Sequence, residues 1–170
     1  MELTRTLLTL AVVSLLILTA SSPQAGDDLK KPFRLKSGNE IIDVNTGHAS
    51  PYLFDFDGDG VRDLLVGEFG KGRLDFEGQL YVRGRLRIYR NIGNETKPNY
   101  EGFKWFQAGG KIAEVPVACC VSFCPEPVDW DGDGDMDMLT GSYPGHLYLY
   151  INDGKGEYAA AKMLRDTGGQ

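Results

Sequence analysis

The feature that most constrains this chain is a nine-residue stretch, residues 55–63, with aspartates at positions 1, 3, 5 and 9 and glycines at positions 4 and 6. Four like charges in so short a loop repel one another, and a bound cation would offset that repulsion. Calcium takes about six to eight oxygen ligands, which alternate residues of a tight loop can direct at one centre. The glycines give the backbone the freedom that such a wrap requires. The stretch therefore predicts a calcium-binding loop.

The same stretch occurs again at residues 129–137, where every aspartate and both glycines are matched 74 residues later. Position 2 is aromatic in both copies, as Phe56 and Trp130, and an apolar run ending in glycine follows each copy. Duplication of the loop, its aromatic residue and the following strand together indicates an internal repeat. An Asp-Gly-rich turn that needs no ion is the alternative for either loop alone.

The segments around the loops are typical of short strands. Residues 85–90 alternate polar and apolar side chains, which places Leu86, Ile88 and Arg90 on one face. Residues 85–91 align with 146–152, which leaves 71–84 as an insertion on a loop. The other expected strands are 33–36, 41–44, 49–54, 64–67, 100–106, 115–123, 138–141 and 157–164. Four antiparallel strands per repeat predict an all-β protein built from β-propeller blades.

These two copies, with residues 85–91 and 146–152 behind them, resemble FG-GAP/VCBS repeats, which form the blades of integrin-α-like β-propellers. The similarity covers roughly residues 41–165, and its Asp-x-Asp-Gly-Asp-Gly-x-x-Asp core is specific. The resemblance implies that each loop binds one calcium ion through four aspartate side chains and one backbone carbonyl. The two implied ligand sets are Asp55, Asp57, Asp59 and Asp63 with the Val61 carbonyl, and Asp129, Asp131, Asp133 and Asp137 with the Asp135 carbonyl.

The fold that we expect is therefore two four-stranded antiparallel blades of an incomplete β-propeller with calcium-binding Asp loops. Propellers have about four to eight blades, so a homo-oligomer could complete the ring. Residues 163–168 resemble 33–38, which is where a third repeat would begin. An EF-hand fits less well, because position 12 is Val66 in one copy and Thr140 in the other.

The chain divides into four expected parts. Residues 1–25 are typical of a signal peptide, with an apolar run at 7–20 and Arg5 before it. Residues 26–40 are a linker and the partial outer strand of a missing blade, 41–107 are repeat 1 and 108–170 are repeat 2. We expect a secreted, periplasmic or cell-surface protein that keeps no membrane span after cleavage; an uncleaved anchor is the alternative.

The three cysteines, Cys119, Cys120 and Cys124, lie within six residues of one another. An odd number in an exported chain leaves at least one thiol unpaired within the molecule. We expect small buried residues in a strand that begins at Val115. A bond between Cys119 and Cys124, or a zinc site, is the alternative.

The remaining composition bears on function. A net charge of −6 argues against nucleic acid as a partner. We expect no enzyme, because His48 and His146 stand alone beside glycines and Ser122 and Ser142 have no identifiable base partner. Side chains expected either to contact a ligand or to pack between blades are Tyr81, Trp105, Tyr143 and Tyr148, and the basic cluster expected at solvent or beside carboxylates is Arg83, Arg85, Arg87 and Arg90.

The sequence thus predicts a secreted calcium-binding β-propeller repeat protein with a structural role or a binding role toward protein or carbohydrate. The alternative is a truncated fragment of a larger secreted propeller-containing enzyme, such as a polysaccharide-degrading protein. The two would differ in whether further repeats continue in frame.

Overall fold

The computed structural model describes residues 30–44, 47–69, 83–116 and 122–165. The chain divides into two units, Met1–Phe33 and Arg34–Gln170, and the elements below belong to the second. Every regular element in the described ranges is a β-strand, which confirms the all-β prediction. No helix in those ranges has the length and apolar character needed to cross a membrane. The expected signal peptide at 1–25, most of the 71–84 insertion, and Cys119 and Cys120 lie outside the described residues.

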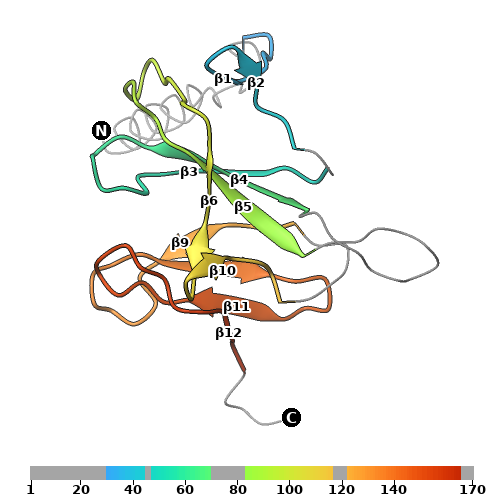
Figure 1. Ribbon diagram of the computed structural model, residues 1–170, viewed down its shortest axis with the longest axis vertical. Coiled ribbons are helices and arrows are strands. Elements are labelled where there is room, and N and C mark those ends of the chain that lie inside the picture. Colours follow the sequence, from blue (N-terminus) through green and yellow to red (C-terminus); the bar gives the residue numbers. More distant parts are fainter. Residues whose placement is uncertain (1–29, 45–46, 70–82, 117–121, 166–170) are drawn as a thin grey trace, which may run out of the picture. The chain divides into compact units, whose positions relative to one another are not determined.

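Two four-stranded antiparallel sheets form the body of this unit (Figure 1). The first sheet consists, in order, of β3 (Ser50–Phe54), β4 (Asp63–Phe69), β5 (Gly84–Tyr89) and β6 (Lys104–Trp105). The second consists of β9 (Glu126–Val128), β10 (Asp137–Gly141), β11 (Leu147–Tyr150) and β12 (Lys162–Met163). The strands β3 and β9 carry Pro51 and Pro127, and both lie at sheet edges, where a missing N–H breaks no ladder bond.

The pairing registers of the two sheets correspond residue for residue. Leu64 faces Tyr89 in the first sheet, and Met138 faces Tyr150 in the second. Residues in the same place in the two registers are called counterparts below. The counterpart pairs are Gly67 and Gly141, Leu86 and Leu147, Arg90 and Ile151, and Asn91 and Asn152. Phe106 and Leu164 are also counterparts, because the Phe106 N–H donates to the Leu86 carbonyl and the Leu164 N–H to the Leu147 carbonyl, both at 2.9 Å.

A small hairpin precedes each sheet. The first pairs β1 (Lys36–Ser37) with β2 (Glu40–Ile41), and the second pairs β7 (Gln107–Ala108) with β8 (Lys111–Ile112). Gly38, at the turn of the first, donates its N–H to the Tyr100 carbonyl at 3.0 Å. Gly109, in the second, donates to the Tyr158 carbonyl at 2.7 Å. The strands expected at 33–36 and 41–44 are thus shorter and form a hairpin.

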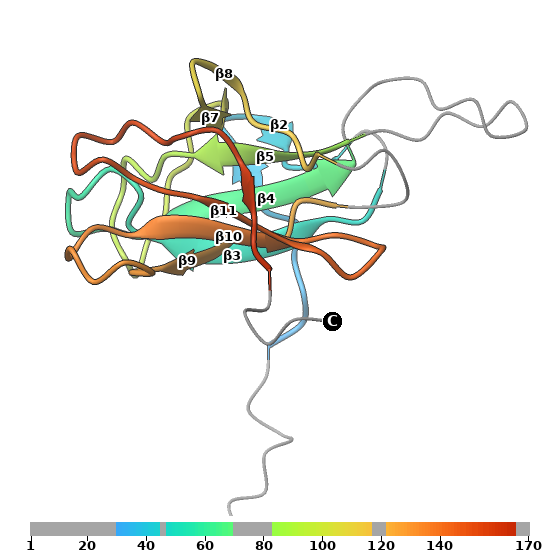
Figure 2. The same cartoon turned by 90° about the horizontal axis from the view of Figure 1, so that it is seen from below.

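The main core lies between the two sheets, which Figures 1 and 2 show face to face. Phe106, which is 1% exposed, lies at its centre. Its ring lies 4.7 to 6.1 Å, centroid to centroid, from the rings of Phe56, Phe123, Tyr150 and Tyr158. A second cluster covers the other face of the first sheet, where Ile42 and Val44 pack on Leu64, Val66, Tyr89 and Tyr100.

Three further expected strands differ from the structure. Of residues 157–164 only Lys162–Met163 is a strand, and Tyr158 forms an isolated bridge to Asn152. Of residues 100–106 only Lys104–Trp105 is a strand, and Tyr100 forms isolated bridges to Ser37 and Asn91. The described ends of 115–123 are not strand; the strand before the second loop is β9. Val115 and Phe123 are buried in the main core although they are not in strands. Apolar residues occur both in paired strands and in buried connections, so the apolar pattern alone did not distinguish the two.

Candidate metal centre

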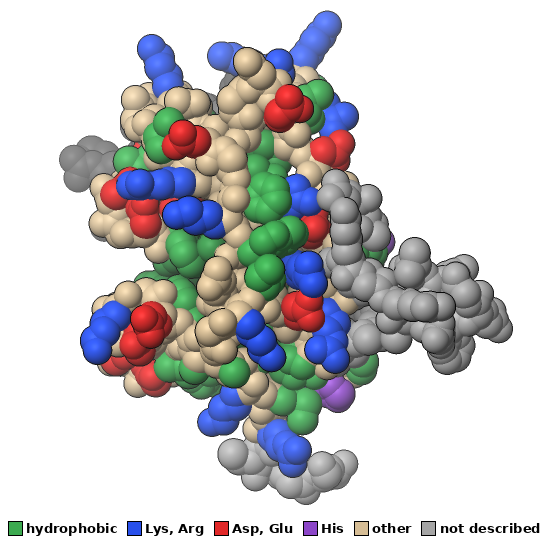
Figure 3. Space-filling model, viewed as in Figure 1, with side chains coloured by type: hydrophobic (Ala, Val, Ile, Leu, Met, Phe, Trp, Pro, Cys, Tyr) green, Lys and Arg blue, Asp and Glu red, His purple; other side chains and the backbone are tan. Residues whose placement is uncertain are grey.

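Each Asp loop brings three carboxylates together, and both loops connect the first two strands of their sheet. Oxygens of Asp55, Asp57 and Asp59 all lie within 4.8 Å of one another, and so do those of Asp129, Asp131 and Asp133. Ligands held about 2.3–2.6 Å from one calcium ion are at most about 4.6–5.2 Å apart. Figure 3 shows acidic side chains gathered at the left edge of each sheet, where Figure 1 draws these connections. The clusters therefore fit a calcium ion in donor chemistry and in size.

Backbone amides hold the first aspartate of each loop. Asp55 accepts N–H bonds from Gly58 at 2.9 Å and Gly60 at 2.8 Å. Asp129 accepts them from Gly132 at 2.8 Å and Gly134 at 3.3 Å. All four glycines have φ between 75° and 95°, which other residues rarely adopt. The glycine requirement inferred from the sequence is confirmed, and each loop is wrapped around its leading carboxylate.

The fourth aspartates, Asp63 and Asp137, are only 1% exposed and bind backbone amides rather than joining the groups of three. Asp63 accepts the N–H of Asn91 at 2.7 Å and of Phe56 at 3.2 Å. In the same way, Asp137 accepts the N–H of Trp130 in its own loop at 3.0 Å and that of Asn152, just after the third strand, at 2.8 Å. Burial raises the pKa of Asp63, and these two amide bonds oppose the rise. These carboxylates tie each loop to its sheet.

The two residues whose carbonyls the resemblance offers as ligands occupy matching places. Val61 donates its N–H to Asp59 at 2.9 Å, and Asp135 donates its N–H to Asp133 at 2.9 Å. The fifth position of each loop is thus fixed by the backbone that follows it.

The two loops differ in their nearest basic group. Arg90 lies with Nε 2.5 Å from Asp57 and Nη2 3.2 Å from Asp59. Hydrogen bonding to Asp59 and attraction to Asp57 raise the pKa of Arg90. The counterpart of Arg90 is Ile151, and among the described residues no ion pair reaches the second loop. Desolvation, followed by repulsion from Asp133, raises the pKa of Asp131. Within the described part of the chain, only the first loop is therefore partly neutralised by the protein.

Sequence reasoning missed two residues that complete the loops. The side-chain amides of Asn91 and Asn152 donate to the Arg62 carbonyl at 3.1 Å and the Met136 carbonyl at 3.3 Å. Their signal was an asparagine at the same aligned position in both copies. The expectation that the basic cluster contacts carboxylates is confirmed by the pairs Arg85–Glu114, Arg87–Glu68 and Arg90–Asp57.

The other candidate residues have local roles. The His48 ring lies 4.4 Å from that of Phe69, and the Ser142 hydroxyl donates to the His146 backbone carbonyl at 3.0 Å. The Ser122 hydroxyl donates to the neighbouring Phe123 carbonyl at 3.4 Å. Cys124 is an exposed free cysteine outside any strand, so the expectation of a buried strand residue is wrong for it.

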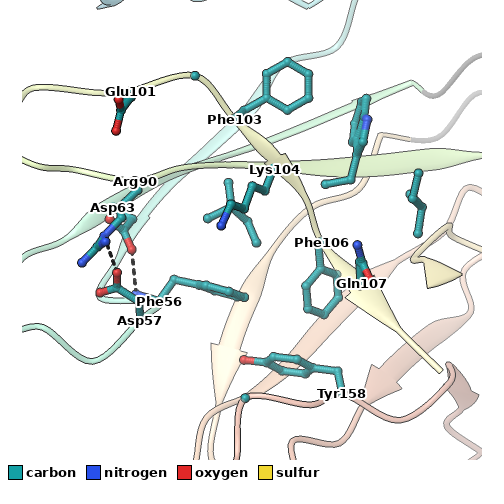
Figure 4. Close-up of a pocket in the computed structure, with 15 residues that line it drawn as sticks. Phe56, Asp57, Asp63, Arg90, Glu101, Phe103, Lys104, Phe106, Gln107 and Tyr158 are labelled. Atoms are coloured by element: carbon teal, nitrogen blue, oxygen red, sulfur yellow. Dashed lines mark hydrogen bonds and ion pairs between the residues drawn. The ribbon is translucent and has the colours of Figure 1, made fainter. Parts of the chain in front are cut away.

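A groove of about 850 Å³ opens beside the first loop and reaches β6 (Figure 4). Phe56, Phe103, Trp105, Phe106 and Tyr158 line it, with Arg90, Lys104, Asp57 and Glu101 among its polar groups. Of the aromatic residues expected to contact a ligand or pack, Trp105 lies here, Tyr148 is buried in the main core and Tyr143 is exposed. Tyr81 lies outside the described residues.

Comparison with known proteins found no relative of this chain. No family model matches it, and no curated protein or solved structure is significantly similar to it.

Proposed function

We propose that this chain is a calcium-binding β-propeller repeat protein, in which each four-stranded sheet is one blade and each Asp loop holds one calcium ion. The observation that carries this proposal is the pair of matched three-carboxylate clusters at the same place in two sheets of the same register. Carboxylate and carbonyl oxygens are the ligands that calcium prefers. A flexible loop suits calcium better than it suits magnesium, because magnesium requires a nearly regular octahedron of ligands.

The role we propose for the ions is structural. Each loop joins the two strands at one edge of its sheet and is anchored through Asp63 or Asp137 to the end of the third strand. An ion that binds the three clustered carboxylates would remove their mutual repulsion and stabilise all three strand ends together.

A binding role toward protein or carbohydrate is supported by the groove beside the first loop. It combines aromatic faces with a few polar groups of both charges, which is the composition of a ligand site. Export from the cell through the expected signal peptide agrees with such a role.

A calcium titration followed by thermal melting tests the proposal. Calcium at a hundredfold excess over its dissociation constant should stabilise the folded chain by about 2.7 kcal/mol per site. Asp59→Ala and Asp133→Ala, at position 5 of the two loops, should each remove one of two sites in isothermal titration calorimetry. A melting temperature that is the same in calcium and in chelator would contradict the proposal.

A further inference from the structure

One face of the second sheet is exposed at Leu147, where the matching position of the first sheet is buried. Leu86 on β5 is 0% exposed in the main core, whereas its counterpart Leu147 on β11 is 47% exposed. Strand alternation places Leu139 on the same face as Leu147, opposite the core residue Met138. This face of the second sheet, called the open face below, comprises Leu139, Gly141, Leu147 and Leu149. Leu149 is only 2% exposed and Leu139 and Gly141 are half-buried, so the exposed part of this face lies at Leu147.

The aromatic residues at position 2 of the loops show the same difference. Phe56 stacks on Tyr158 with ring centroids 6.0 Å apart and meets the edge of Phe106 at 6.1 Å, so the first loop packs against the second sheet's side of the core. Trp130, in the same place in the second loop, is 51% exposed.

The glycines that follow the two loops also differ. A Cβ atom on Gly67 would lie 1.5 Å from the Phe123 carbonyl oxygen, because the chain entering the second sheet crosses directly over it. On the counterpart Gly141, the nearest described atom is 3.9 Å away and belongs to Leu147 of the same sheet. At Gly141 the open face therefore has room for another segment of backbone to approach closely, as the Phe123 carbonyl approaches Gly67 on the first sheet.

The element that would cover the open face is present at the other end of the same unit. Phe106 immediately precedes the second hairpin and packs in the main core against Tyr158, and Gly109 of this hairpin donates its N–H to the Tyr158 carbonyl. In the first hairpin, Gly38 donates its N–H to the Tyr100 carbonyl in the same way. Leu35 has the place in this hairpin that Phe106 has in the second: the Ile42 N–H donates to the Leu35 carbonyl at 3.0 Å, and the Ala113 N–H to the Phe106 carbonyl at 2.9 Å. Leu35 is 37% exposed and Phe106 only 1%.

We propose that the open face of one copy binds the first hairpin of a second copy, head to tail, and so repeats the interface that joins the two sheets within each copy. Leu164 of the same chain donates its N–H to the Leu147 carbonyl, as Phe106 does to that of Leu86, so Leu35 of the second copy would displace Leu164 from this place. A second copy fits because this chain carries both halves of that interface, one buried version and one exposed version of each. Such a contact is heterologous and closes into a ring when its rotation allows. With two sheets per copy, about two to four copies would give the four to eight sheets of a closed propeller. This contact involves packing faces alone and does not depend on calcium.

The test is the mass of the full chain in solution, measured by size exclusion with light scattering up to about 100 µM. We expect a mass two to four times the 18.7 kDa of one chain. Leu147→Arg should give a monomer, because it places a charge in the contact while its half-exposed site keeps the fold intact. Ile92→Arg is the matched control: Ile92 is also half exposed, follows the same strand in the first sheet, and its counterpart is the charged Asp153.

A mixing experiment tests the head-to-tail geometry. Leu35→Asp should also give a monomer, and an equimolar mixture with Leu147→Arg should give a dimer, because each variant retains the face that the other has lost. A monomeric wild-type chain would overturn the proposal. An assembly that survives Leu147→Arg would overturn it too, since association would then run through another surface, such as the apolar segment at residues 7–20. Circular dichroism of each variant confirms that its fold is intact.

Discussion

Replacing Phe106 by alanine should separate the two sheets. Phe106 is 1% exposed and is supplied by the connection between the sheets, next to β7. Four aromatic rings surround it: that of Phe56 in the first loop, and those of Phe123, Tyr150 and Tyr158. Removing the ring would leave a cavity that none of these rigid neighbours can fill without leaving its own position.

The size of the effect follows from burial and contacts. Full burial of a phenylalanine side chain is worth about 1.5–3 kcal/mol, and favourable aromatic pairs add about 0.5–1.5 kcal/mol each. Measured Phe→Ala substitutions in cores cost about 3–5 kcal/mol. Four ring contacts place Phe106→Ala near the top of that range, at roughly 4–5 kcal/mol. This is a large share of the 5–15 kcal/mol typical of a domain.

Equilibrium urea unfolding in calcium chelator, followed by circular dichroism and tyrosine fluorescence, measures this loss. Leu164→Ala is the control, because Leu164 makes the same backbone bond at the same place in the second sheet but is only partly buried. We expect it to cost less than half as much. The first sheet keeps its own cluster around Tyr89 and Tyr100, so the Phe106 variant should also show a smaller m-value or two transitions.

Two results would refute this reasoning. A loss below about 2 kcal/mol for Phe106→Ala would mean that the inter-sheet core is not what stabilises the unit. Equal losses for Phe106→Ala and Leu164→Ala would mean that the two positions are equally packed, against the burial described here.

Arg90→Ile should tighten calcium binding to the first loop by about tenfold, measured by calorimetry, because a cation already paired with two loop carboxylates is removed; an unchanged affinity would show that the arginine does not compete. Asp63→Asn should cost roughly 1–3 kcal/mol even in chelator, because one amide donor would then face another donor; a loss seen only with calcium present would assign Asp63 a ligand role alone. Gly67→Ala should prevent folding, seen by circular dichroism, because its Cβ would meet a carbonyl oxygen at 1.5 Å, whereas Gly141→Ala should fold. Burial raises the pKa of Tyr158 from 10.0 to about 12, so its contribution to stability should be complete below pH 10 and lost as pH rises through about 12, as alkaline denaturation would show; a flat profile in that window would contradict it.

The strands around the Asp loops were predictable because their signals are local. Alternation at 85–90 and the apolar runs after each loop placed β4, β5, β10 and β11 correctly. The hairpin around Gly38 and the passage at 115–123 were not, because their side chains are apolar for tertiary reasons. Gly38 donates its N–H to the distant Tyr100 carbonyl and Val115 is buried in the main core, and single-sequence patterns do not distinguish such tertiary contacts from strand pairing.

The site was predictable in its residue types and less so in its geometry. Spacing predicted the grouping of Asp55, Asp57 and Asp59, since Asx-type bonds to the following amides are short-range. It did not predict that Asp63 is buried against the Asn91 amide, because that bond spans 28 residues. Nor did it predict that Arg90 is close to the first loop, which depends on β5 ending beside the connection between β3 and β4.

The two loops, although alike in sequence, should therefore act on different parts of the protein. Phe56 carries the first loop into the core between the sheets, where it contacts Phe106 and Tyr158. An ion that orders this loop would stabilise the packing of one sheet on the other. Trp130 carries the second loop to an exposed position on the side that we propose binds a second copy. Among the described residues no cation pairs with the second loop, so its occupancy should respond most directly to the calcium concentration. Calcium would then act on assembly chiefly through the second loop and on the folding of a single copy chiefly through the first.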